Sequence, residues 1–301
     1  MKKKKNYRVI GIMTGTSMDG IDISYCSTDG LNNIKIFNEK SYSYPISIQT
    51  VIKKIKIINY SNNKNIKKYD KKITDIIINY LKIFLKEFVI SKKQIDFISL
   101  SGQTVLHVPK KKFTLQLGNP NLICKSLKLN VVSDFRIKDI LNGGQGAPIG
   151  SYYHKLLINK INPKSAIINL GGVANFSLQN KKKLISSDIG PANAITDDLM
   201  FYFFKKKFDR NGNIASKGTK NIKIFELYKK NSFFKKTFPK SLDRNNFHYL
   251  FKKLKKLRSY DALNTSSNFT IHSIIKLIDH KICKNINEFI LTGGGRKNEY
   301  I

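Results

Sequence analysis

A glycine-rich turn near the start of the chain joins two apolar segments. The segments, 7–12 and 21–27, are rich in the β-branched and aromatic residues typical of strands. The turn reads Thr14-Gly-Thr-Ser-Met-Asp-Gly-Ile-Asp22. Glycine permits positive φ and a close approach to a ligand, and successive backbone N–H groups can then bind an anion. An ordinary hairpin is the alternative, because Asp-Gly is also a strong turn pair.

The same design recurs in the second half of the chain. The apolar segment 165–170 ends at Gly171 and Gly172, and a later strand ends at Asp188, before a helix that begins at Asn193. A carboxylate at a strand end can act as a general base. Asp188 could equally cap the turn that follows it. Two such halves facing each other would form a clamp for phosphate groups.

The order of the apolar segments predicts the fold class. A meander of three strands ends near residue 44. The expected helices then cover 46–58, 70–89, 151–158, 193–206 and 261–282, and the expected strands cover 94–100, 113–117, 130–133, 165–170, a segment near 184, and 288–291. Strands followed by alternating helices and strands favour an α/β protein with mixed sheets. We divide it into an N-terminal domain, 1–145, and a C-terminal domain, 146–301.

Charge and cysteine content restrict the partners and the compartment. The 55 Lys and Arg residues outnumber 20 Asp and Glu residues, which gives a formal net charge of +35. A nucleic-acid partner would explain this charge, but the lysine runs are spread over the chain, so we favour compositional bias. The three cysteines are scattered, which fits a reducing cytoplasm. No apolar run approaches the ~18 residues of a membrane span.

Two further glycine-rich motifs are candidates for binding. Gly293–Gly295 follow a strand and could admit a flat group such as adenine, although a flexible loop is the alternative. The segment Gly143–Pro148 follows Arg136. The guanidinium of Arg136 could bind a carboxylate or phosphate in a bidentate manner. It could also form a surface ion pair with Asp134 or Asp139.

Taken in order, these motifs resemble those of the anhydro-N-acetylmuramic acid kinase family. The matching segments are Gly11–Asp22, Gly102–Thr104 with His107 and Pro109, Asp134–Arg136, Gly143–Pro148, Asn169–Asn175, Asp188–Asn193, Ala215–Gly218 and Gly293–Gly295. The resemblance implies an actin/hexokinase-like (ribonuclease H-like) ATPase fold, with two α/β domains around a central cleft. It also implies a kinase of peptidoglycan recycling. That kinase uses ATP and water to convert 1,6-anhydro-N-acetylmuramic acid into N-acetylmuramic acid 6-phosphate.

The resemblance also assigns roles to residues. It makes Asp188 the general base that activates water. The ATP-binding set is Gly15, Thr16, Ser17, Met18, Asp19, Gly20, Ile21, Asp22, Gly171, Gly172, Gly293, Gly294 and Gly295. The expected sugar contacts are Gln103, Arg136, Gln145 and Asn193. Mg²⁺ would accompany ATP through Asp19 and Asp22, without a dedicated metal site. The expected partners are ATP and an amino sugar, without a membrane, and a homodimer is left open.

The chain departs from the family pattern at several places. Ser101 stands where the family has His, Thr14 where it often has Ser, and Ala192 where it has Gly. The family continues beyond the triple glycine, whereas this sequence ends at Ile301, so we expect a C-terminal domain that is incomplete at its end. An inactive remnant is therefore the alternative to an active kinase. A basic nucleic-acid-binding protein ranks third.

Overall fold

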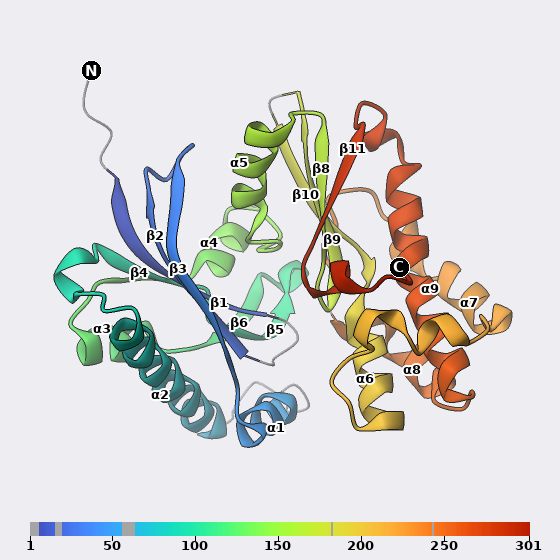
Figure 1. The fold of residues 1–301 in the computed structure, drawn as a ribbon, viewed down its shortest axis with the longest axis horizontal. Helices are drawn as coiled ribbons and strands as arrows, with labels where there is room; N and C mark the ends of the chain where they lie inside the picture. Colours follow the sequence, from blue (N-terminus) through green and yellow to red (C-terminus); the bar gives the residue numbers. More distant parts are fainter. Residues whose placement is uncertain (1–5, 16–19, 56–63, 182, 243) are drawn as a thin grey trace. The chain divides into compact units, whose positions relative to one another are not determined.

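The computed structural model describes residues 6–15, 20–55, 64–181, 183–242 and 244–301. The chain divides into two compact units, Met1–Gly146 and Ala147–Ile301. Each unit is built on one main mixed sheet with helices packed against it (Figure 1). The mixed α/β class expected from the sequence is therefore confirmed.

The main sheet of the first unit begins with an antiparallel meander and continues with parallel strands. Its strands are β1 (Tyr7–Thr14), β2 (Gly20–Thr28), β3 (Ile34–Ser43), β4 (Phe97–Leu100) and β7 (Val131–Val132), in the order β3-β2-β1-β4-β7. β1 pairs antiparallel with β2 and parallel with β4. Strand β3 is therefore an edge of this sheet within the described residues.

Helices cover one face of this sheet. They are α1 (Ile46–Ile55), α2 (Lys64–Glu87) and α3 (Pro120–Leu127), with α4 (Phe135–Leu141) and the small β5 (Gln103–Val108) and β6 (Phe113–Leu117) sheet completing the unit. Along α2, Ile73, Ile77, Leu81 and Phe84 are fully buried and follow helical spacing. They join the isoleucines of β1 and β2 in one core, so the burial of this apolar stripe fixes α2 against the sheet.

The second unit repeats the arrangement. Its strands are β8 (Ser165–Leu170), β9 (Val173–Asn180), β10 (Lys183–Pro191) and β11 (Glu288–Thr292), in the order β10-β9-β8-β11. Its helices are α5 (Ser151–Ile161), α6 (Asn193–Phe204), α7 (Ile222–Lys229), α8 (His248–Leu254) and α9 (Ser259–Ile278). As in the first unit, a three-strand meander is followed by a strand parallel to the first one. In this sheet β10 takes the edge position that β3 has in the first.

The structure corrects several sequence-based expectations. Helix α2 begins at Lys64 rather than Asp70. Gln103, expected in a polar turn, starts strand β5. Strand β9 and helix α4 were not predicted. The glycines before β9 suggested a loop, although its residues alternate as in a strand. Helix α4 is short, and it begins after Asp134, whose φ of 66° places it in the left-handed region.

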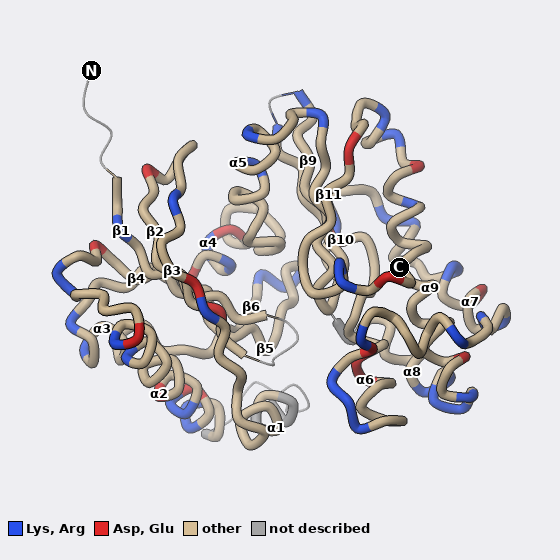
Figure 2. Tube along the Cα trace, in the orientation of Figure 1, with Lys and Arg blue, Asp and Glu red and all other residues tan. Residues whose placement is uncertain are grey.

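Basic residues are spread over both units. Figure 2 shows lysine and arginine on helices, strands and connections of each unit rather than on one element. This distribution fits the compositional explanation of the charge, because a nucleic-acid site gathers its basic residues on one surface.

Candidate active site

The glycine-rich turn of the first unit is attached to the segment that follows β4. The Oγ1 atom of Thr14 donates to the carbonyl of Gly102 at 2.7 Å, and Nε2 of Gln103 donates to the carbonyl of Gly15 at 3.2 Å. Thr16–Asp19 lie outside the described residues. Because β1 and β4 are parallel neighbours, their carboxyl ends reach the same edge of the sheet. This pairing brings the predicted phosphate turn and the predicted sugar contact Gln103 together.

The three remaining residues of this turn have different environments. Gly20 packs so closely on the carbonyl of Tyr42 that a side chain there would overlap it. Ile21 is buried in the core, whereas Asp22 is exposed on the opposite face of β2. The carboxylate of Asp22 accepts a hydrogen bond from the hydroxyl of Ser41 on β3. Of the two predicted Mg²⁺ contacts, the described one is thus open to solvent.

Arg136 holds the second glycine-rich loop of the first unit. It is buried to 9% exposure, and its guanidinium donates to the carbonyl of Gly146 at 2.8 Å. The carboxylate of Asp139 accepts from the backbone N–H of Gly146 at 2.7 Å. Arg136 therefore shapes the loop that carries Gln145, and Gln145 itself is half-buried.

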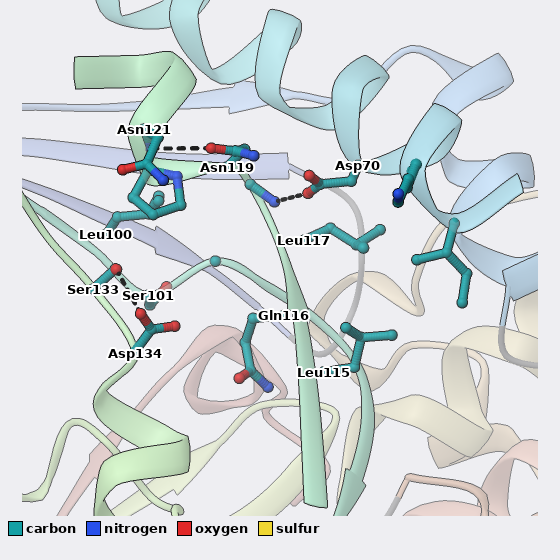
Figure 3. Close-up of a pocket in the computed structure, with 15 residues that line it drawn as sticks. Asp70, Leu100, Ser101, Leu115, Gln116, Leu117, Asn119, Asn121, Ser133 and Asp134 are labelled. Carbon is teal, nitrogen blue, oxygen red and sulfur yellow. Dashed lines mark hydrogen bonds between the residues drawn. The ribbon is translucent and has the colours of Figure 1, made fainter. Parts of the chain in front are cut away.

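A cavity of about 300 Å³, lined by both polar and apolar side chains, opens where β4 ends. Its polar lining comes from α2, the ends of β4 and β7, strand β6 and the start of α3, and includes Asp70, Ser101, Gln116, Asn119, Ser133 and Asp134 (Figure 3). The hydroxyl of Ser101 is buried and has no hydrogen-bond partner among the described residues. Ser133 donates to the carboxylate of Asp134 at 3.1 Å beside it. The cavity thus offers hydroxyl, amide and carboxylate groups to a polar ligand.

In the second unit, Asp188 belongs to a row of polar side chains that crosses the whole sheet. Asp188 on β10 is paired with Asn175 on β9, which is paired with Asn169 on β8. Asn169 is paired in turn with Thr292 on β11. Residues directly opposite one another point to the same face of a sheet. Apolar side chains of the same strands fill the other face, so the polar row is segregated from the core.

Asp188 lies at an irregularity of its strand. It is paired with Asn175, and Gly190 with Ala174, so that Ile189 is the extra residue of a β-bulge. Bulges re-aim side chains and are over-represented next to active sites. Asp188 is only 7% exposed, and its Oδ2 accepts from the backbone N–H of Leu242 at 2.7 Å. A hydrogen bond of this kind stabilises the ionised carboxylate.

The double glycine between β8 and β9 supports the start of α6. The carbonyl of Gly171 accepts from the N–H of Asn193 at 3.0 Å, and that of Gly172 accepts from Ala192 and Ala194. These bonds satisfy N–H groups that a helix leaves without internal partners. The side chain of Asn193 donates to the carbonyl of Leu170 at 3.0 Å. The helix start is therefore built directly onto the turn.

The triple glycine after β11 lies against the same turn. Gly293 has a φ of 78°, and a side chain there would contact Asn169 and Leu170. Gly295 is buried, with the position of a Cβ atom only 2.6 Å from Cβ of Leu170 and 3.0 Å from Oδ1 of Asn193. Gly294 faces open space. The structure thus brings Gly171, Gly172, Asn193 and the triple glycine into one glycine-lined surface.

The sequence identified the motif Asn169–Asn175 together with Asp188, but neither the strand register that joins them nor the contact with the segment 240–242 was predicted. Asn169, Asn175 and Thr292 join Asp188 through strand register, and the segment 240–242 joins it across more than fifty positions of sequence. Polar residues at alternate positions of an apolar strand were a usable sequence signal. Such residues share one face of the sheet, because successive side chains of a strand point to opposite faces. Within the described residues, no cluster of three His, Cys, Asp or Glu side chains could hold a metal ion. None of the described helices has the length and apolar character needed to cross a bilayer.

The order β3-β2-β1-β4 in the first sheet recurs as β10-β9-β8-β11 in the second, and a glycine turn follows the first strand of each unit. Together with the buried carboxylate of Asp188, this arrangement fits a phosphotransferase. The profile of the anhydro-N-acetylmuramic acid kinase family matches residues 7–301. The chain belongs to this family, whose kinases act in amino-sugar and peptidoglycan recycling.

Two curated relatives agree with this assignment. An anhydro-N-acetylmuramic acid kinase of Gamma-proteobacterium EBAC31A08 is 36% identical, with 99% of this chain and 82% of the relative covered. The anhydro-N-acetylmuramic acid kinase of Pelagibacter ubique (strain HTCC1062) is 33% identical, with 98% of this chain and 81% of the relative covered. Among solved structures, a putative N-acetylmannosamine kinase of Listeria monocytogenes is 12% identical, with a TM-score of 0.35. The match covers 95% of this chain and 83% of that structure's chain.

Proposed function

We propose that the protein phosphorylates 1,6-anhydro-N-acetylmuramic acid at the expense of ATP, with Asp188 as the general base. Asp188 takes a proton from water, and the water oxygen attacks the anomeric carbon. The bond from that carbon to the bridging oxygen breaks, and the oxygen remains on carbon 6. There it accepts the γ-phosphoryl group, which gives N-acetylmuramic acid 6-phosphate and ADP. The observation that carries the proposal is the buried Asp188 carboxylate at the bulge of β10.

The glycine turns are proposed to bind the nucleotide. The turn from Gly15 to Asp22 would bind phosphate oxygens through backbone N–H groups, and Gly293–Gly295 would border the adenosine. Asp22 is exposed and has carboxylate oxygens, which fits a magnesium ion bound mainly by phosphates and one or two carboxylates. Mg²⁺ would supply neutralisation of phosphate charge. Asp19, the second proposed contact, belongs to the same turn.

The sugar is proposed to use polar groups in each unit. The cavity beside Ser101 has the size and the hydrogen-bonding groups for part of an amino sugar. Gln103 donates a hydrogen bond to the carbonyl of Gly15, and Arg136 donates one to the carbonyl of Gly146. We propose that the loops held in this way contact the sugar, together with Gln145 and Asn193. A central cleft, a homodimer and a cytoplasmic location remain predictions from the family resemblance.

The test is turnover of anhydro-N-acetylmuramic acid with Mg²⁺-ATP, followed as ADP and sugar phosphate. Asp188→Asn should lower kcat by about 10²–10⁴-fold, the contribution of a general base. Asp22→Asn, which alters an exposed carboxylate, should mainly raise KM for ATP. In water enriched in ¹⁸O, the oxygen that joins carbon 6 to phosphorus should stay unlabelled. Full activity of Asp188→Asn, or label in that oxygen, would contradict the proposal.

A further inference from the structure

The segment 236–242 closes the outer edge of β10 beside Asp188. The backbone N–H of Asp188 donates to the carbonyl of Lys240 at 3.0 Å. The hydroxyl of Ser187 donates to the same carbonyl at 2.9 Å and accepts from the N–H of Lys240 at 2.8 Å. Leu242 then donates its N–H to the Asp188 carboxylate. These hydrogen bonds therefore tie the position of the Asp188 carboxylate to the position of the Lys240 backbone.

The side chain of Lys240 anchors the other end of this connection. Its Nζ donates to the carbonyls of Phe233 at 3.1 Å and Lys236 at 3.2 Å, at the end of the 3₁₀ helix Ser232–Lys235. Carbonyls at a helix end favour a cation. The same Nζ lies 4.4 Å from the ring centre of Phe233 and 4.7 Å from that of Phe238. Within these distances an ammonium is attracted to an aromatic face.

The environment of Lys240 is unusual for a lysine. Burial, followed by the charges of Lys276 and Lys236, lowers its pKa to about 8. A partly desolvated ammonium interacts more strongly with carbonyls and rings than one in water. The ring of Phe238 also packs on Phe176 of β9 at 5.0 Å between ring centres. The aromatic site around Lys240 is thus joined to the same sheet as Asp188.

We propose that Lys240 is a positioning residue, which holds the segment 240–242 so that the Leu242 amide orients and stabilises the ionised Asp188. The proposal rests on the proposed role of Asp188 as the general base. Lys240 itself need not touch the substrate. The ammonium of Lys240 binds the carbonyls of Phe233 and Lys236. The backbone N–H and carbonyl groups of Lys240 bind Ser187 and Asp188 on β10, so the anchored lysine fixes the position of the segment against that strand.

The test compares two lysines of the same segment. Lys240→Met keeps the aliphatic packing but removes the ammonium, and kcat should fall by about tenfold to a hundredfold, as expected for a misplaced catalytic group. KM for ATP and for the sugar should stay within about twofold. Lys236→Met is the matched control, because Lys236 is exposed and lies 5.9 Å from the ring centre of Phe233; it should keep wild-type kcat. Lys240→Arg, which retains the charge, should recover part of the loss.

A double substitution separates positioning from a general structural effect. In the Asp188→Asn background, Lys240→Met should cause little further loss, because the group that it orients is absent. An equal loss in both backgrounds, or a kcat no lower than that of Lys236→Met, would overturn the inference. If Lys240→Met does not fold, Phe238→Leu weakens the same anchor and should show the same pattern. Loss of activity in Asp188→Asn without loss in Lys240→Met removes only this inference, whereas an active Asp188→Asn removes the proposed base.

Discussion

The two edge strands β3 and β10 occupy the same place in two sheets that share the order of four strands, yet they have opposite environments. Most of β3 is exposed, and its partners outside the sheet are surface groups such as Glu87 of α2, which pairs with Lys40 at 2.5 Å. The carboxyl half of β10 is buried and bonded to the segment 240–242. Surface ion pairs of the first kind contribute little to stability. The repeated strand order therefore provides a scaffold, and added segments decide which edge can hold a buried carboxylate.

The largest expected effect is at the contact between β10 and α9. A methyl group at Gly190 would overlap the hydroxyl of Ser273 and lie 2.9 Å from its Cβ. Gly190→Ala should lower the free energy of unfolding by up to about 3 kcal/mol, the upper range for overpacking. At Gly11 on β1 a methyl group would meet only Ser24, at 3.0 Å from Oγ. Gly11→Ala should change stability by less than about 1 kcal/mol. Thermal and urea denaturation would measure both, and equal losses would show that the two sheets are packed equally tightly.

A smaller effect is expected from the serines of the two edge strands. Ser187→Ala leaves the N–H of Lys240 without the hydroxyl acceptor, and Ser187 is only 1% exposed. The cost should be about 1–2 kcal/mol, as for other buried groups that lose a partner. Ser41→Ala on β3 removes a bond to the exposed Asp22, which water can replace, and should cost less than about 0.5 kcal/mol. The same denaturation experiments apply, and a larger loss at Ser41 would reverse the comparison.

The smallest expected effect is the pH dependence of stability that arises from His154, which contacts the polar face of the second sheet. His154 of α5 bonds to the hydroxyl of Ser177 at 2.9 Å, and burial lowers its pKa from 6.5. The unfolded chain therefore binds the proton more readily, and stability should decline as the pH falls below about 6.5. His154→Asn, which can still bond to Ser177, should reduce this decline. Melting temperatures at about pH 7.5 and about pH 5.5 would measure it; an unchanged slope in the variant would assign the decline to other groups.

Much of the fold could be predicted from local patterns. The spacing of Ile73, Ile77, Leu81 and Phe84 is sufficient for α2, and the short apolar segments are sufficient for β1, β2, β4 and β8. Strand β9 was missed because glycine at its start resembled a loop. The alternation of Phe176, Ser177 and Leu178 was the available sequence signal, and the pairing with both β8 and β10 shows the place of β9 in the sheet.

The site was predictable in its motifs but not in its connections. The glycine turns and Asp188 could be identified because glycines and a carboxylate follow or end apolar segments that predict strands. The bond from Leu242 to Asp188 joins residues 54 positions apart, and the segment that carries it has no helical or strand period. Such contacts depend on how a loop packs in three dimensions, which local propensity does not encode.

The bonds between the segment 240–242 and β10 have a second consequence, for solubility. An edge strand with unpaired backbone groups is a template for the strand of another molecule, and charged side chains are one means of preventing this. Strand β3 carries Lys35, Glu39 and Lys40 along its exposed length, whereas beside Asp188 the backbone of Lys240 occupies the edge. A chain whose 240–242 segment detaches would expose the backbone edge of β10, so the contacts proposed to support Asp188 also cover an edge that would otherwise be open to intermolecular strand addition.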